Sequence, residues 1–223
     1  MTKNEVLKIL SDLGNEKRRE MYRKKGAGDN TYGVLMGELR KLAKQLGPNQ
    51  ELAFELWQSE NTDARWLACM IFEGKKLTPD EVKSMVSELT YADLIDKFIG
   101  EVICDLSYAD ELAKEWSASD RDNLGRAGWD IIAYKVSEGK LKDEVLEEQL
   151  AIIEAGLQTA PEAKQWAMNH ALCEIGICYP KYTKRCITLG ETLGVYKGMK
   201  VAKGCTSAYA PEWIAAGLRK RKN

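Results

Sequence analysis

A helical phrase recurs along the chain, and it limits the possible folds more than any other feature of the sequence. In each copy a turn bearing an aromatic residue is followed by an Arg or a Trp that opens a new apolar helix. The copies lie at 57–68, 116–129 and 160–168. Because repeated helix pairs can bury their apolar faces only against their neighbours, this self-similarity predicts a stack of helices with one long concave surface.

The spacing of apolar residues predicts helices along the whole chain and no strand. Capping signals support several helix starts; for example, Thr78 precedes Pro79, and Glu81 completes a capping box. We therefore expect an all-α superhelix, an α-solenoid, forming one domain over 1–223 with a loose basic segment over about 197–223. Helices are expected at 3–24, 32–46, 49–58, 62–73, 79–89, 91–105, 108–118, 122–138, 142–157, 161–177 and 180–194, with a short one at 210–220.

Composition places the chain among ordinary soluble proteins, with 44% hydrophobic and 30% charged residues. The longest apolar run, 66–72, is far shorter than the roughly 20 residues of a membrane helix. The N-terminus lacks the apolar core of a signal peptide, so we expect a cytoplasmic protein. The six cysteines form no CxxC pair and His170 is the single histidine, so we expect neither a metal site nor a cofactor.

Charge is distributed unevenly along the chain. From residue 181 onward there are ten Lys or Arg and two acids, which gives a net charge of +8, whereas residues 1–180 have a net charge of −9. A second basic cluster lies at 17–25. Such clusters suit a polyanion, whose phosphates exchange their counterions for Lys and Arg. Solubilising tails are the alternative, and composition does not decide between the two.

One phrase is specific enough to indicate a family. Segment 32–44 reads Y-G-V-L-M-G-E-L-R-K-L-A-K, and weaker matches follow at 55–57, 64–65 and 169–176. On these segments the chain resembles the HEAT-like-repeat alkylpurine DNA glycosylases of bacteria and their relatives. The resemblance covers most of the chain and implies a HEAT-like-repeat fold. It also implies that the chain binds double-stranded DNA and excises N3- and N7-alkylated purines by hydrolysing the N-glycosidic bond.

The resemblance also assigns catalytic roles. An alkylated purine is cationic, so an enzyme needs only a negative charge near the sugar and a positioned water. In the family an Asp in a Trp-Asp-x-x-Asp phrase supplies that charge, an Arg holds the DNA backbone, and two Trp rings pack around the sugar. Here the phrase falls on 92–96, so Asp96 keeps the acid while Ala92 replaces the tryptophan. The arginine falls on Arg126 and the second tryptophan near Glu174, so two of four signature positions differ.

The expected site therefore combines catalytic and DNA-binding residues. Asp96 and Arg126 are expected to be catalytic, although Arg126 could instead pair with Asp93, Asp96 or Asp130. Trp129 and Trp166 could reach a groove or belong to the core. The residues expected to contact DNA are Arg65, Lys181, Lys184, Arg185, Lys197, Lys200 and Lys203.

Three functions remain open from the sequence. The first is a DNA-binding protein related to the glycosylases, with excision weakened or lost because both signature tryptophans are absent. The second is a non-catalytic module that binds distorted or branched nucleic acid. The third is a scaffold for a protein partner, the commonest use of helical solenoids, which the −9 charge of the first 180 residues favours.

Overall fold

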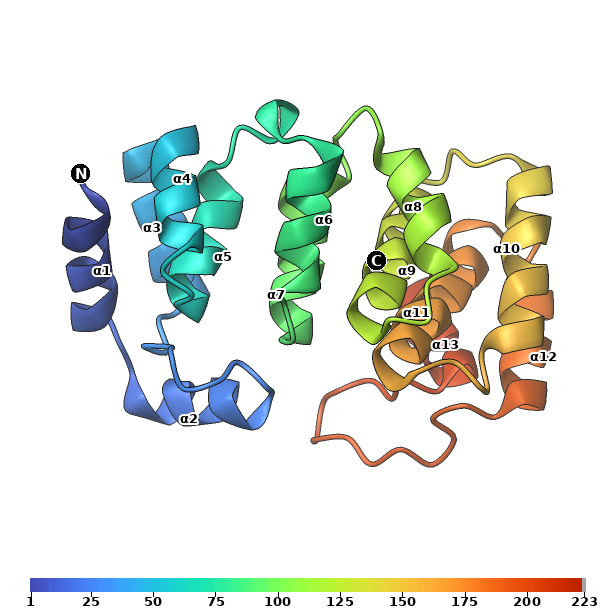
Figure 1. Ribbon diagram of the computed structural model, residues 1–223. Coiled ribbons are helices and arrows are strands. Elements are labelled where there is room, and N and C mark those ends of the chain that lie inside the picture. Colours follow the sequence, from blue (N-terminus) through green and yellow to red (C-terminus); the bar gives the residue numbers. More distant parts are fainter. Residues whose placement is uncertain (222–223) are drawn as a thin grey trace. The chain divides into compact units, whose positions relative to one another are not determined.

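The computed structural model describes residues 1–221, and within them the chain is all-α, with thirteen α-helices, two short η elements and no strand. The expectation of an all-α chain is confirmed. The helices group into two compact units, Met1–Ala109 and Asp110–Asn223, which are described in turn (Figure 1). The repeat pattern does not reveal this division, because helices recur at similar spacing on both sides of residue 109.

The first unit is a series of short helices. Its elements are α1 (Lys3–Asp12), α2 (Glu16–Lys24), α3 (Met36–Leu46), α4 (Gln50–Trp57), α5 (Thr62–Ile71), η1 (Gly74–Lys76), α6 (Pro79–Ser87), α7 (Ala92–Phe98) and the π-helical η2 (Ile99–Ile103). The predicted capping box at Thr78 and Glu81 opens α6 as expected. Among residues 1–221, no helix is long and apolar enough to cross a membrane.

The second unit holds the longer helices. Its elements are α8 (Ala109–Ser117), α9 (Asp122–Ser137), α10 (Asp143–Gly156), α11 (Glu162–Cys178), α12 (Thr183–Leu193) and α13 (Ala210–Arg221). Within this unit α9 packs extensively against α11, and α11 also contacts α12 and α13. A Cβ at Gly217 of α13 would lie 2.4 Å from Ile177 Cδ1 of α11, so a larger residue there would require the Ile177 side chain to move.

Two expected helices differ from the structure. The helix expected at 3–24 breaks after Asp12, because the Asn15 side chain caps a new helix by accepting from the Arg18 N–H at 3.0 Å. The helix expected at 91–105 begins as α7 and passes into η2, where Cys104 N donates to Ile99 O over five residues. Both differences follow from local hydrogen bonds that apolar spacing does not report.

A buried carboxylate fixes the loop between α2 and α3. Asp63, near the start of α5, has no exposed surface. It accepts four hydrogen bonds of 2.6–3.2 Å from this loop, from the hydroxyl of Thr31 and the backbone N–H groups of Tyr32, Gly33 and Val34. The first three residues of the 32–44 segment are therefore held in place by their backbone N–H groups.

Gly33 is required at the centre of this contact. Its φ of +77° lies in the left-handed region, and a Cβ there would lie 2.4 Å from the backbone nitrogen of Arg19. The loop therefore approaches α2 more closely than a residue with a side chain permits.

Four tryptophans of the first two copies of the recurring phrase are buried in the cores of the two units. Trp57 and Trp66 of the first unit are each 3% exposed, while Trp116 and Trp129 of the second are 1% and 0% exposed. Trp57 packs on Phe98 with ring centroids 4.7 Å apart. The sequence left open whether Trp129 reaches a groove, and its complete burial excludes that role.

We predict that Asp63→Ala strongly destabilises the fold. The change removes the acceptor of three backbone N–H groups, and each unsatisfied buried donor costs about 1–3 kcal/mol. The free energy of unfolding in urea is therefore expected to fall by about 3 kcal/mol or more. Asp12→Ala, at an exposed acid that pairs with Lys8, is the control and is expected to change it by at most about 1 kcal/mol. Equal stability of the two variants would contradict the role of Asp63.

Candidate nucleic-acid interface

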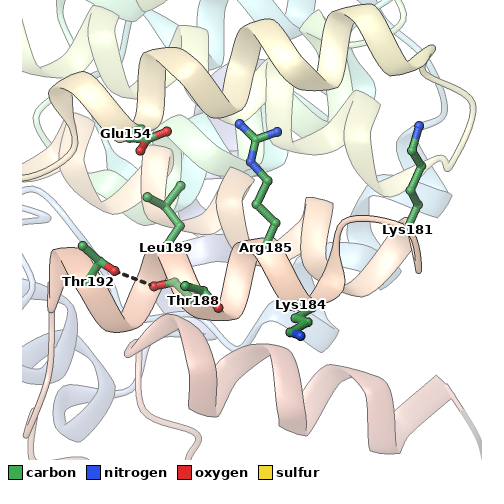
Figure 2. Close-up of a pocket in the computed structure, with 7 residues that line it drawn as sticks. All are labelled: Glu154, Lys181, Lys184, Arg185, Thr188, Leu189 and Thr192. Carbon is green, nitrogen blue, oxygen red and sulfur yellow. Dashed lines mark hydrogen bonds between the residues drawn. The ribbon is translucent and has the colours of Figure 1, made fainter.

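A basic hollow lies between α10 and α12 in the second unit. It has a volume of about 480 Å³ and is lined by Lys181, Lys184, Arg185 and Glu154, together with Thr188, Leu189 and Thr192 (Figure 2). Lys181, Lys184 and Arg185, all three predicted to contact DNA, therefore line one hollow. Their availability to a ligand nevertheless differs.

Two of these three cations are paired with acids of α10. Lys181 bonds to Asp143, and Arg185 bonds to Glu147. These bonds hold the pKa values of both carboxyls below their usual range, and the solvent-exposed carboxyls remain charged. Lys184 forms no ion pair among residues 1–221, and Figure 2 shows its side chain directed away from α10.

A segment with free lysines follows α12, and we call residues 194–208 the basic loop. Lys197, Lys200 and Lys203 are exposed there and form no ion pair with any described residue. Met199 and Val201 between them are 42% and 41% exposed. In Figure 1 this segment runs out from the helices of its own unit. It thus presents three unneutralised charges to solvent.

Both ends of the basic loop are held against α11. The Tyr196 ring packs edge-on against Trp166, with centroids 5.5 Å apart, and Asn169 Nδ2 donates to Ala208 O at 2.8 Å. Gly194 ends α12 in the left-handed conformation, which turns the chain out of the helix. Trp166 and Asn169 are one helical turn apart, so a single stretch of α11 positions the loop.

Arg126, which was expected to contact the DNA backbone, is buried in this structure. Its side chain is 6% exposed, and its Nε lies 3.4 Å from Asp130 Oδ2 one turn along α9. Its Nη1 also donates to Ala163 O at 3.5 Å. In this conformation the guanidinium faces protein, which matches the ion-pair alternative for this residue.

Arg65 is also held by the protein. Its Nε donates to Trp57 O at 3.1 Å, its guanidinium lies 5.3 Å from the Trp57 ring, and its Nη2 lies 3.4 Å from Glu88. Its side chain is 12% exposed. These contacts link α4, α5 and α6, and they give Arg65 a structural role in the first unit.

Asp96 has an exposed side chain on α7 of the first unit, whereas Arg126 belongs to the second unit. Asp93, one turn earlier, is bonded to Lys25 Nζ at 3.1 Å and to the Tyr91 hydroxyl at 3.0 Å. Lys25 belongs to the second basic cluster of the sequence. Half of the six cations in that cluster are paired in this way, since Arg19 and Arg23 also contact acids.

Glu174, near the second signature tryptophan position, belongs to a polar network. Its Oε1 lies 3.6 Å from His170 Nε2, and its Oε2 accepts from Cys178 Sγ at 3.5 Å. The bond to His170 is the main reason that the pKa of Glu174 lies below its usual value. The His170 ring stacks on Trp213 of α13, with centroids 5.3 Å apart and an interplanar angle of 21°. The sequence did not predict that Trp213 contacts His170, because no sequence pattern relates α13 to α11.

We predict that Glu174→Gln removes a pH-dependent part of the stability. A carboxyl with a lowered folded-state pKa stabilises the fold above its ordinary value of 4.5, and this contribution is lost as the pH falls through the folded-state pKa. The variant is therefore expected to be less stable than the parent protein near pH 7, with the difference shrinking toward about pH 3. Urea unfolding at several pH values measures it, and Glu148→Gln on exposed α10 is the control. Parallel pH profiles for Glu174→Gln and the parent protein would contradict the role of the network.

Comparisons with known proteins match a family model and two relatives along most of the chain. A family model described as DNA alkylation repair enzyme matches residues 6–214. Uncharacterized proteins of Listeria innocua and Listeria monocytogenes are 24% and 23% identical over 220 and 217 residues, each covering 92% of this chain and 91% of the relative.

A solved structure matches the fold. It represents a new family of proteins related to the HEAT-like repeat DNA glycosylases, with affinity for branched DNA structures. It matches with a TM-score of 0.85 and 24% identity, over 99% of this chain and 95% of that one. The fold is therefore a HEAT-like helical repeat, as the sequence predicted. With nearly its whole length matched by the family model, the chain belongs to the DNA alkylation repair enzyme family.

Proposed function

We propose that this chain binds DNA, and branched or distorted DNA in particular, without excising bases. The observation that carries the proposal is that four of the lysines predicted to contact DNA are exposed and form no ion pair among residues 1–221: Lys184, Lys197, Lys200 and Lys203. The affinity of the structurally similar protein for branched DNA supports the choice of substrate.

Free lysines suit a phosphate backbone better than paired ones do. A lysine that already pairs with a carboxylate must exchange that partner for a phosphate, whereas a solvated lysine only releases counterions from the DNA. Lys181 and Arg185 are in the first situation, because they bond to Asp143 and Glu147. The free lysines are therefore expected to supply most of the electrostatic affinity.

Base excision has weaker support. Ala92 and Glu174 stand where the related glycosylases carry rings that pack around the sugar, and Glu174 pairs with His170. Arg126 faces Asp130 and the backbone of α11. Excision through Asp96 is the second candidate, since its carboxylate is exposed.

We predict that replacing Lys197, Lys200 and Lys203 together by Gln weakens binding to a four-way DNA junction. Each lost phosphate contact lowers the slope of log Kd against log salt concentration by about 1, so the triple variant is expected to lose about 3. Fluorescence anisotropy over a series of salt concentrations gives this slope.

The matched control replaces Lys114, Lys140 and Lys142 by Gln, three exposed lysines of the second unit outside the proposed interface. This control is expected to keep the slope of the parent protein. An equal loss in both triple variants would show a nonspecific charge effect. Failure of the parent protein to bind DNA at moderate salt would refute the proposal and favour a protein scaffold.

A separate prediction concerns excision. The parent protein is expected to release no more 7-methylguanine from alkylated duplex DNA than Asp96→Asn does, because two signature rings are absent. Chromatography of the released bases measures it. Release by the parent protein that Asp96→Asn abolishes would overturn this part of the proposal and establish Asp96 as catalytic.

A further inference from the structure

A pocket with aromatic walls lies between α11, α13 and the end of the basic loop. Its volume is about 280 Å³, and its lining includes Trp166 from α11, Thr206 and Ala208 from the segment before α13, and Trp213, Gly217 and Lys220 from α13. The size is near the lower limit of small-molecule sites, and a single nucleotide component suits it better than a large ligand does.

The rings of this pocket are fixed by their neighbours. Trp166 and Trp213 lie with centroids 5.9 Å apart at an interplanar angle of 57°. The His170 ring stacks on Trp213, and Tyr196 packs edge-on against Trp166. Because these contacts hold both indoles in one arrangement, a ligand that stacks on them need not order them first.

These two tryptophans differ from the other four in their exposure. Trp57, Trp66, Trp116 and Trp129 are at most 3% exposed. Trp166 and Trp213 keep part of their surface open to solvent. Exposed indole surface that lines a pocket is available to stack on a flat ring, and every base has such a π-face.

Positive charge surrounds the aromatic surface. Lys220 lines the pocket, is exposed and forms no ion pair among residues 1–221. Lys203 of the basic loop precedes the lining residue Thr206 by three positions. Flat apolar walls beside lysines match a nucleotide, which joins an aromatic base to a phosphate, whereas an apolar peptide would gain nothing from the lysines.

We propose that this pocket receives one unpaired base of the bound DNA, which stacks on Trp166 and Trp213 while Lys220 contacts a neighbouring phosphate. The inference rests on the proposed function, because it assumes that the chain binds DNA. It adds a means of distinguishing branched from fully paired DNA: only DNA with unpaired bases can fill the pocket.

The test compares a fully paired duplex with the same duplex carrying a single bulged nucleotide. Stacking of one base on an aromatic side chain is worth roughly 5-fold to 150-fold in affinity, so the parent protein is expected to prefer the bulged duplex by a factor in that range. Trp213→Ala is expected to remove most of this preference while leaving affinity for the paired duplex within about 2-fold. Trp166→Ala is also expected to remove the preference, but because Trp166 packs against Tyr196 of the basic loop, it is expected to weaken binding to the paired duplex as well.

Three further variants separate stacking from stability and charge. Trp213→Phe keeps an aromatic ring against His170 and is expected to retain most of the preference. Lys220→Gln, at an exposed position, is expected to weaken binding to the bulged duplex without altering the fold. Tyr134→Ala removes an exposed ring of α9 outside the pocket and is the matched control. Thermal unfolding checks that each variant is folded.

Tryptophan fluorescence gives a second measurement that does not depend on the alanine variants. Because the other four indoles are buried, oligothymidine is expected to quench mainly Trp166 and Trp213. Trp166→Phe and Trp213→Phe together are expected to abolish most of the quenching.

The outcomes distinguish this inference from the proposed function. A parent protein that binds both duplexes equally, or alanine variants that keep the full preference, would overturn the pocket while leaving DNA binding intact. Equal losses on both duplexes would also overturn it, because they indicate a general contact. Absence of binding to any DNA would refute the proposed function itself.

Discussion

The packing of α11 against the segment that follows α12 is the contact on which the proposed interface depends. Trp166 and Asn169, one turn apart on α11, hold Tyr196 and Ala208 at the two ends of the basic loop. Burial raises the pKa of the Tyr196 hydroxyl, with Glu162 adding to the shift and the Arg126 guanidinium opposing it. Both ends of the loop are therefore fixed against α11, and its lysines extend into solvent between them.

Pairing of charges decides which cations remain available to a ligand. In the second unit Lys181 and Arg185 are neutralised by acids of α10, and Arg126 is buried beside Asp130. In the first unit Arg65 packs on Trp57. Of the residues predicted to contact DNA, Lys184 and the three lysines of the basic loop therefore remain available to a polyanion. The net charge of a segment is thus a poorer guide than the partners of each side chain.

The repeat pattern and the capping signals predicted most helices, because both report local hydrogen bonding and burial. The box at Thr78 is one example. The pairing of Arg126 with Asp130 was also among the alternatives, since it joins residues one helical turn apart. The pairing of Lys181 with Asp143 joins residues 38 apart, and the stacking of His170 on Trp213 joins two separate helices. Such contacts depend on tertiary packing, which apolar spacing does not encode.

Lysine footprinting tests the central claim most directly. Exposed lysine amines are modified chemically with and without a four-way DNA junction, and mass spectrometry gives the protection of each. The account predicts protection of Lys184, Lys197, Lys200 and Lys203, and none of Lys114 or Lys140. Protection confined to lysines outside this set, with the basic loop modified equally in both states, would contradict it.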